Sequence, residues 1–345
     1  MFRPASREPD FENFVRMLKK QPSRPVLFEF IISSDKEKFL TGPLYNDQTE
    51  WDRVLTTISA FDSAGYDHAP IIVRGMEFPR HEEIHENVRT KSLNAGTMIT
   101  DWRSFNDYPW PDVNRCDFDL IKRAGKFLSP KVKFTPFSHD GILENTIGIV
   151  GYENLCLMLY DDPKLAEAIF YEVGRRIAEY FERCLAYDKV GAIICNDDWG
   201  FNTQTMLPPD VLRKYVFPWY KKIVAMAHEK NKYALLHSCG YYHDIIDDII
   251  KDMKFDGKHS FEDKIVPVEK AYLDLKGKIA VVGGIDVNFL TRASKEEVYE
   301  RAVKLLRLTK EAGGFALGSG NSIPDFIPLE NYLAMLQAAF DEDQI

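Results

Sequence analysis

The stretch YALLHSCG, residues 233–240, combines a buried-strand pattern with a pair of reactive side chains. Its continuous apolar run is typical of a strand that is buried on both faces, as in parallel sheets. The run ends in a histidine, a serine, a cysteine and a glycine. Side chains two residues apart on a strand point to the same side, so His237 and Cys239 are expected to converge where the strand ends.

Similar runs recur along the chain and alternate with helical segments. Eight strands alternating with helices predict a (β/α)₈ TIM barrel, an α/β fold, as a single domain over residues 1–345. A helix is expected over residues 207–231, and Pro218 must kink or split it. Residues 76–115, rich in Pro, Asn, Asp and Trp, are expected to form an elaborated loop after the second strand. The eight runs are VLFEFI (26–31), APIIVRG (69–75), VKFTPFSH (132–139), GAIICNDDW (191–199), YALLHSCG (233–240), FDGKHS (255–260), IAVVGGID (279–286) and GFALGSGNS (314–322).

Composition narrows the class of protein and its partners. The 345 residues are 45% hydrophobic and 28% charged, as in soluble globular proteins with a large core. The net charge of −9 and the lack of a basic stripe argue against a nucleic-acid partner. The sequence shows no signal peptide and no apolar stretch of roughly 18 residues, so no membrane span is expected. Five scattered cysteines fit a reducing compartment, and the protein is expected in the cytoplasm.

Polar and ionisable residues gather at the carboxyl end of nearly every predicted strand. Taken singly, each of these residues is explained as a solvent-exposed loop residue. In a (β/α)₈ barrel, however, the active site lies at the carboxyl ends of the strands. The recurrence therefore predicts a site there. The candidates are Glu29, Arg74, His139, Asn196, Asp198, Trp199, His237, Cys239, His259, Asp286, Ser319 and Asn321.

Two groups of these residues suggest particular chemistry. A thiolate beside an imidazole suits Zn²⁺, which takes about four ligands, although a packed cysteine beside a backbone-held histidine is the alternative. Asp197 and Asp198 are adjacent, so only one of them can face the barrel mouth. Two nearby carboxylates raise the pKa of one of them, which suits protonation of a leaving alkoxide. A helix cap or an ion-paired loop acid is the alternative for these residues. His139 and His259 are the other acid–base candidates.

Several stretches resemble the uroporphyrinogen decarboxylase superfamily from about residue 145 to the C-terminus. LLHSCG (235–240), followed by an amphipathic helix, resembles the segment that carries the zinc-binding His-x-Cys in the cobalamin-dependent methyltransferase branch. LPPDVLRKYVFPWYKKIVAMAH (207–228) resembles a conserved helix of the superfamily. GSGNSIPDFIPLENYLAML (318–336) resembles its closing strand and helix, and GGID (283–286) also fits.

Two departures from the patterns of the superfamily bear on which of its branches the chain resembles. The decarboxylases hold a carboxylate-rich tetrapyrrole with arginines after the first strand, in a stretch like RQAGR. Here that place reads VLFEFIISSDKEKFL (26–40), with Glu29 where carboxylates would need a guanidinium. In thiol-methylating relatives the third zinc ligand is a cysteine in a stretch like GCGI. This chain has Asn321 or a neighbour in its place and no cysteine after Cys239.

The implied function is a zinc-dependent methyltransferase. It moves a methyl group between a small methylated substrate, or a thiol, and a corrinoid (cobalamin) carried by a separate partner protein. His237 and Cys239 would hold the zinc, and an oxygen of Glu29, Asp198 or Asp286 would complete the site, unless zinc binds weakly or not at all. Asp198, His139 and His259 would be catalytic, and the remaining candidates would bind the substrate or the corrinoid: Glu29, Arg74, Asn196, Trp199, Asp286, Ser319 and Asn321.

Two alternatives remain open. A uroporphyrinogen decarboxylase, or a related cofactor-free decarboxylase, would need arginines at the barrel mouth, where only Arg74 is obviously placed. A non-catalytic protein that binds a corrinoid or tetrapyrrole is the second, because the third cysteine is missing. Convergent carboxylates at the His-x-Cys pair would count against this second alternative.

Overall fold

Eight parallel strands form the centre of the computed structural model, which describes residues 3–4, 7–81 and 93–344. The order across the sheet is β1-β8-β7-β6-β5-β4-β3-β2, and every neighbouring pair is parallel. The strands are β1 (Val26–Leu27), β2 (His68–Ile72), β3 (Lys133–Phe137), β4 (Ala192–Asn196), β5 (Tyr233–His237), β6 (Gly257–His259), β7 (Ala280–Val282) and β8 (Phe315–Leu317).

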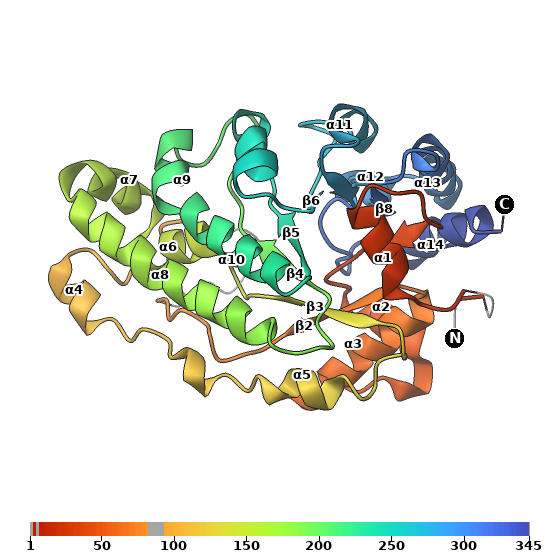
Figure 1. Cartoon of the computed structure of the whole chain (residues 1–345), viewed down its shortest axis with the longest axis horizontal. Helices are drawn as coiled ribbons and strands as arrows, with labels where there is room; N and C mark the ends of the chain where they lie inside the picture. The colour runs from red at the N-terminus through yellow and green to blue at the C-terminus, as the bar shows by residue number, and fades with distance from the viewer. Residues whose placement is uncertain (1–2, 5–6, 82–92, 345) are drawn as a thin grey trace.

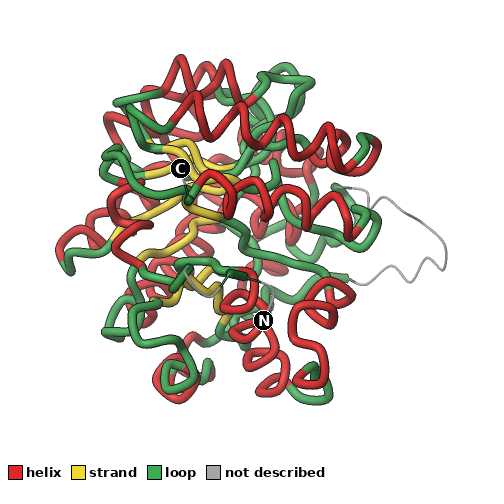
Figure 2. The backbone as a smooth tube through the Cα atoms, turned by 90° about the vertical axis from the view of Figure 1, so that its right-hand side faces the viewer, coloured by secondary structure: helices red, strands yellow, loops and turns green. Residues whose placement is uncertain are grey.

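Helices occupy the connections and surround the strands (Figures 1 and 2). This alternation confirms the predicted (β/α)₈ barrel. No helix in the described part of the chain is long and apolar enough to cross a membrane. The α-helices are α1 (Phe11–Leu18), α2 (Ser34–Thr41), α3 (Glu50–Ala64), α4 (Trp102–Asp107), α5 (Asp119–Ala124), α6 (Ile142–Val150), α7 (Tyr152–Asp161), α8 (Pro163–Cys184), α9 (Pro209–Tyr215), α10 (Phe217–Glu229), α11 (Val268–Leu275), α12 (Val287–Arg292), α13 (Lys295–Thr309) and α14 (Leu329–Glu342). Shorter turns are the 3₁₀ helices η1 (Gly42–Leu44), η2 (Val113–Arg115) and η3 (His243–Ile245), and the π-helix η4 (Asp248–Asp252).

Two local features of the sequence shape the connections. Pro218 splits the helix expected over 207–231, so that α9 ends at Tyr215 and α10 begins at Phe217 with the proline in its first turn. The elaborated loop expected at 76–115 falls partly outside the described residues. Its described part contains α4 and η2, and the whole connection from β2 to β3 also includes α5.

Apolar side chains fill the inside of the barrel. They come from alternate positions of the strands, as the two-residue period of a strand requires. Helix α1 adds Phe14 and Leu18 at the amino-terminal end, where the amide of Phe11 donates to the carbonyl of Lys131. The inward-facing residues of the strands, and of the segment that follows β1, are Val26, Phe28, Phe30, Ala192, Ile194, Leu235, Ala280, Val282 and Ala316.

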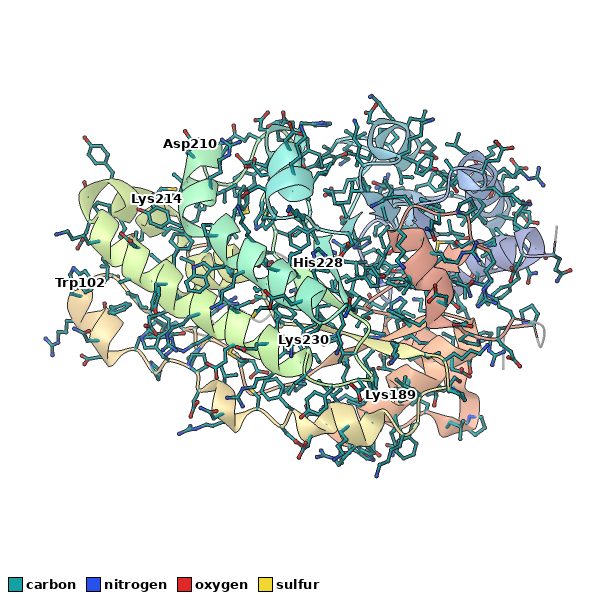
Figure 3. The ribbon with its side chains drawn as sticks, viewed as in Figure 1. Trp102, Lys189, Asp210, Lys214, His228 and Lys230 are labelled. Carbon is teal, nitrogen blue, oxygen red and sulfur yellow. The ribbon has the colours of Figure 1, made fainter. Side chains whose placement is uncertain are left out.

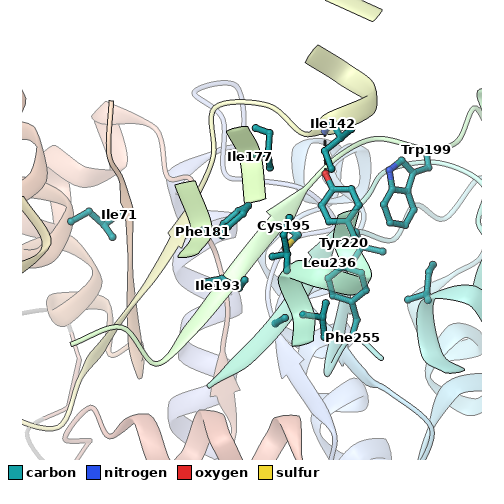
Figure 4. Packing of buried hydrophobic residues seen from close by; sticks show 14 of the residues in the cluster. Ile71, Ile142, Ile177, Phe181, Ile193, Cys195, Trp199, Tyr220, Leu236 and Phe255 are labelled. Atoms are coloured by element: carbon teal, nitrogen blue, oxygen red, sulfur yellow. Dashed lines mark hydrogen bonds between the residues drawn. The ribbon is translucent and has the colours of Figure 1, made fainter. Parts of the chain in front are cut away.

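A second core lies between the strands and the outer helices. On β4, Ile193 and Cys195 face outward, where Phe181 of α8 and Tyr220 of α10 cover them (Figure 4). The tyrosine hydroxyl accepts a hydrogen bond from the amide of Ile142 at 3.1 Å. The strands are therefore buried on both faces, which explains their continuous apolar runs.

Aromatic packing joins the two end strands of the sheet. β1 has only two residues, and within the described residues it pairs with β8 and not with β2. The ring of Phe28, just after β1, stacks on the ring of His68 of β2 with their centroids 5.2 Å apart. Phe14 of α1 contacts both rings, with centroid distances of 6.2 Å to Phe28 and 4.9 Å to His68. Side-chain packing thus continues the barrel where the hydrogen-bonded ladder stops.

The substitution Phe14→Ala is expected to lower the free energy of unfolding by about 3–5 kcal/mol, because it leaves a cavity between α1, Phe28 and His68. Urea denaturation followed by circular dichroism measures the change. Leu157→Ala on α7 is the control, because that side chain is 62% exposed and its loss should change stability by less than about 0.5 kcal/mol. Equal losses in the two variants would contradict the role assigned to α1.

Candidate metal centre

The register of β4, β5 and β6 sets three polar side chains in one row. Asn196 pairs with His237, and His237 pairs with His259. Two residues earlier on β4 and β5, the inward-facing partners are the apolar Ile194 and Leu235. The polar row therefore lies directly above the apolar filling of the barrel, at the carboxyl ends of the strands.

The next inward positions, two residues further along, hold Asp198 and Cys239. A carboxylate oxygen of Asp198, a ring nitrogen of His237 and the sulfur of Cys239 all lie within 4.8 Å of one another. Sγ of Cys239 is 3.7 Å from Nε2 of His237. Oδ1 of Asp198 accepts the backbone amide of Cys239 at 2.8 Å, which holds the two segments together. The structure thus brings together the pair expected from YALLHSCG and one of the three acids expected to complete it.

Further groups surround the thiol. Nδ2 of Asn321, after β8, is 3.1 Å from Sγ of Cys239, and the hydroxyl of Ser260 is 3.7 Å away. Burial, and then the charge of Asp198, raise the pKa of Cys239 well above its usual range. A thiol in this position becomes a thiolate when a cation compensates its charge.

His237 is held from the opposite side. Its Nδ1 is 2.7 Å from Nδ1 of His259, and Nε2 of His259 is 3.0 Å from the carbonyl oxygen of Ser319. The ring of Phe30 packs on His237 with a centroid distance of 4.6 Å. Burial lowers the pKa of both histidines, to about 3 for His259, so both rings are neutral near pH 7. His237 therefore meets the cluster as a neutral imidazole, the form that binds metals.

The two adjacent aspartates have separate partners. Asp197 points outward, where it accepts the amides of Leu143 and Glu144 at 2.9 Å each and so binds the start of α6. It also accepts the indole N–H of Trp199 at 2.9 Å and the hydroxyl of Tyr220. Burial raises the pKa of Asp197 to about 7. Trp199 is fully buried against α10, and Asp198 faces the cluster.

Glu29 and Ser319 form a buried pair on the outer side of β1 and β8. The amide of Ser319 donates to Oε1 of Glu29 at 2.5 Å, and its hydroxyl is 2.7 Å from Oε2. Burial raises the pKa of Glu29 to about 8, so the carboxyl group is largely protonated at neutral pH. Glu29 thus contacts the loop after β8 and does not belong to the Asp198–His237–Cys239 group.

The remaining predicted residues lie at strand ends without joining that group. The guanidinium of Arg74 is exposed, 4.0 Å from Glu50, and His139 is exposed after β3. Asp286 caps α12 by accepting the amide of Phe289 at 3.0 Å, and also accepts the amide of Asp263. Asn196 is buried and accepts a hydrogen bond from the hydroxyl of Ser138 at 3.2 Å.

Three further residues near the strand ends were not among the predicted site residues. Phe30 packs on His237, and its place two residues after Phe28 was a usable sign that it faces inward. Lys258 is fully buried and donates to the carbonyl of Ser260 at 2.8 Å, with its ammonium 4.2 Å from the ring centre of Tyr242. Arg80 donates to Asp140 at 2.7 Å after β3, and nothing in the pattern around it indicated this contact.

Comparisons with known proteins bear on the family and the fold of the chain. Residues 140–341 match the family described as uroporphyrinogen decarboxylase (URO-D). A solved methyltransferase from Methanosarcina mazei superposes with a TM-score of 0.69 at 16% identity, over 95% of this chain and 97% of that chain. An intracellular xylanase from Thermoanaerobacterium saccharolyticum gives a TM-score of 0.43 at 9% identity, over 96% and 99% of the two chains. No curated protein matches the sequence.

These features define a class and then a family. Fold and site together describe a (β/α)₈ barrel with a cluster of metal-binding donor types at the carboxyl ends of its strands. The chain belongs to the uroporphyrinogen decarboxylase family, because the matched region covers more than half of it.

The substitution Glu29→Gln tests the buried carboxyl group. With a folded pKa of about 8 against an ordinary value of 4.5, folded Glu29 keeps its proton between these values while the unfolded chain loses it. The wild type should therefore lose stability relative to Glu29→Gln as the pH rises from 5 to 8, by up to about 1.4 kcal/mol per pH unit. Urea denaturation of both proteins across this range measures the difference. Parallel pH profiles would show that the proton is not retained on folding.

Proposed function

We propose that the protein is a zinc-dependent methyltransferase that moves a methyl group between a small methylated substrate, or a thiol, and a corrinoid on a partner protein. The observation that carries this proposal is the convergence of Asp198, His237 and Cys239 at the carboxyl ends of β4 and β5. The superposition on a methyltransferase over 95% of the chain supports it.

The donor set fits zinc. A tetrahedral zinc site places donors about 2.0–2.3 Å from the ion and so roughly 3.5 Å from one another. The 3.7 Å between Sγ of Cys239 and Nε2 of His237 is close to this value, and all three donor atoms lie within 4.8 Å of one another. Three protein ligands leave a fourth position for a substrate, as in catalytic zinc sites. When bound, zinc would polarise a methyl-bearing oxygen or lower the pKa of a coordinated thiol.

The chain's own residues would divide the remaining work. Asp198 serves as a ligand in this proposal, so His139, exposed on the loop after β3, is the predicted residue left to carry a proton. Asn321 is placed to hydrogen-bond the sulfur of Cys239. Phe30 and the apolar layer below it exclude water from the ring of His237.

Charges at the mouth favour methyl transfer over decarboxylation of a tetrapyrrole. A substrate with many carboxylates needs free guanidinium groups. In the described part of the chain, two arginines follow β2 closely, and both have acidic neighbours: Arg74 near Glu50, and Arg80 bound to Asp140. The convergent carboxylate of Asp198 also counts against a non-catalytic binding protein.

Metal analysis of protein purified without added metal tests the site itself. We expect about one zinc per chain in the wild type and far less in Cys239→Ala and His237→Ala. Asp198→Asn should weaken zinc binding by at least about 10-fold while keeping the hydrogen bond to the amide of Cys239. Cys156→Ala is the matched control, because Cys156 is an exposed cysteine on α7.

Either of two results would reject zinc binding. One is a folded wild type that binds no zinc even when the ion is supplied. The other is a zinc content that Cys239→Ala leaves unchanged.

An activity assay tests the reaction. Zinc-loaded protein should convert free cob(I)alamin to methylcobalamin with at least one donor from a panel of methanol, methylamines, methyl ethers and methyl thioethers, or demethylate methylcobalamin with a thiol. Absorbance of the corrinoid follows both directions. Asp198→Asn should lower the rate at least about 100-fold, because a weakened metal site loses several kcal/mol of transition-state stabilisation.

The same zinc-loaded protein also tests the alternative that the chain is a uroporphyrinogen decarboxylase. Cys156→Ala should react at the wild-type rate. Decarboxylation of uroporphyrinogen by a preparation that transfers no methyl group would overturn the proposed function in favour of the decarboxylase.

A further inference from the structure

A buried chain of hydrogen bonds leads from Glu29 to the ring of His237. It passes from the carboxyl group of Glu29 to Ser319, from the carbonyl of Ser319 to His259, and from His259 to His237. Glu29, Ser319 and His259 are fully buried, so water does not compete for the hydrogen bonds between them. The chain ends at the nitrogen of His237 that faces away from Cys239.

The carbonyl oxygen of Ser319 determines which atom donates and which accepts in each hydrogen bond of this chain. A carbonyl oxygen only accepts hydrogen bonds, so Nε2 of His259, 3.0 Å from the carbonyl of Ser319, must carry the hydrogen. In a neutral imidazole the other nitrogen is then an acceptor. Nδ1 of His259 therefore accepts, and Nδ1 of His237, 2.7 Å away, must donate. This leaves Nε2 of His237 without a hydrogen.

The same nitrogen is the one that faces the cluster. Nε2 of His237 is 3.7 Å from Sγ of Cys239. The two rings also keep their relative position, because Phe30 packs on His237 at 4.6 Å and Phe28 packs on His259 at 5.1 Å between ring centres. The alternative tautomer of His237 would place two acceptors against each other in a buried site, which is costly.

We infer that His259 is a positioning residue, anchored by Ser319 and Glu29, that locks His237 in the tautomer whose Nε2 lone pair faces Asp198 and Cys239. His259 acts only through His237, since its own two nitrogens are both used in this chain. The link to metal affinity rests on the proposed zinc site, whereas the tautomer itself is a property of the metal-free protein.

The tautomer is measured first, on the whole chain with ¹⁵N-labelled histidine, freed of metal by a chelator. A long-range ¹H–¹⁵N correlation spectrum separates protonated from unprotonated ring nitrogens, and His237→Gln identifies the signals of His237. We expect hydrogen on Nδ1 of His237 and on Nε2 of His259, with a scalar coupling between their Nδ1 nitrogens. Hydrogen on Nε2 of His237 would overturn the inference whether or not zinc binds. The expected tautomers in a protein that binds no zinc would support the inference and reject the proposed function.

Zinc titration of three variants tests the consequence. His259→Leu should weaken zinc binding about 10–100-fold, as loss of an outer-shell partner does. His259→Gln should recover most of this loss, because its carboxamide offers one donor and one acceptor. His228→Gln on the outer helix α10 is the matched control and should leave the affinity unchanged (Figure 3). Wild-type affinity in His259→Leu would overturn the positioning role, and the tautomer measurement decides the matter if that variant does not fold.

Discussion

The parallel register of β4, β5 and β6 is the constraint on which both the barrel filling and the site depend. Paired residues on adjacent parallel strands point their side chains to the same face of the sheet, and successive side chains of one strand alternate between the inside and the outside. Asn196, His237 and His259 thus form one inward-facing row, and the inward-facing residues two positions earlier on β4 and β5 are apolar. A slip of one residue in β5 would turn His237 outward and bring Leu236 inside, so it would disrupt the core and the site together.

The same alternation explains what could be predicted from the sequence. It placed His237 and Cys239 on one side of a strand end, and it required Asp197 and Asp198 to point to opposite faces. Both statements depend only on positions within one strand. The structure places Asp198 beside Cys239 and leaves Asp197 to hold the start of α6. Which of the two acids would face inward depended on the register of β4, which a single strand does not reveal.

Contacts across the barrel were beyond such local reasoning. Glu29 was grouped with the residues of the mouth, although alternation within FEF (28–30) already separates it from Phe28 and Phe30. Its partner Ser319 is 290 residues away, just after β8, the strand that pairs with β1. Asn321 likewise meets Cys239 across 82 residues. These pairs form only when the ends of the sheet curl toward each other. A short stretch of sequence does not show which distant residues will then meet.

The charges of the proposed zinc site explain how it can lack a third cysteine. A buried cluster is costly unless its charges balance, because little solvent remains to compensate them. The thiolate of Cys239 and the carboxylate of Asp198 already match the two positive charges of zinc, and His237 is neutral. A further thiolate at the position of Asn321 would add another negative charge next to Cys239, on which Asp198 and Glu262 already act electrostatically. The neutral amide of Asn321 instead donates to the sulfur of Cys239, which lowers the negative charge on the sulfur and strengthens the pull of the metal on a fourth ligand.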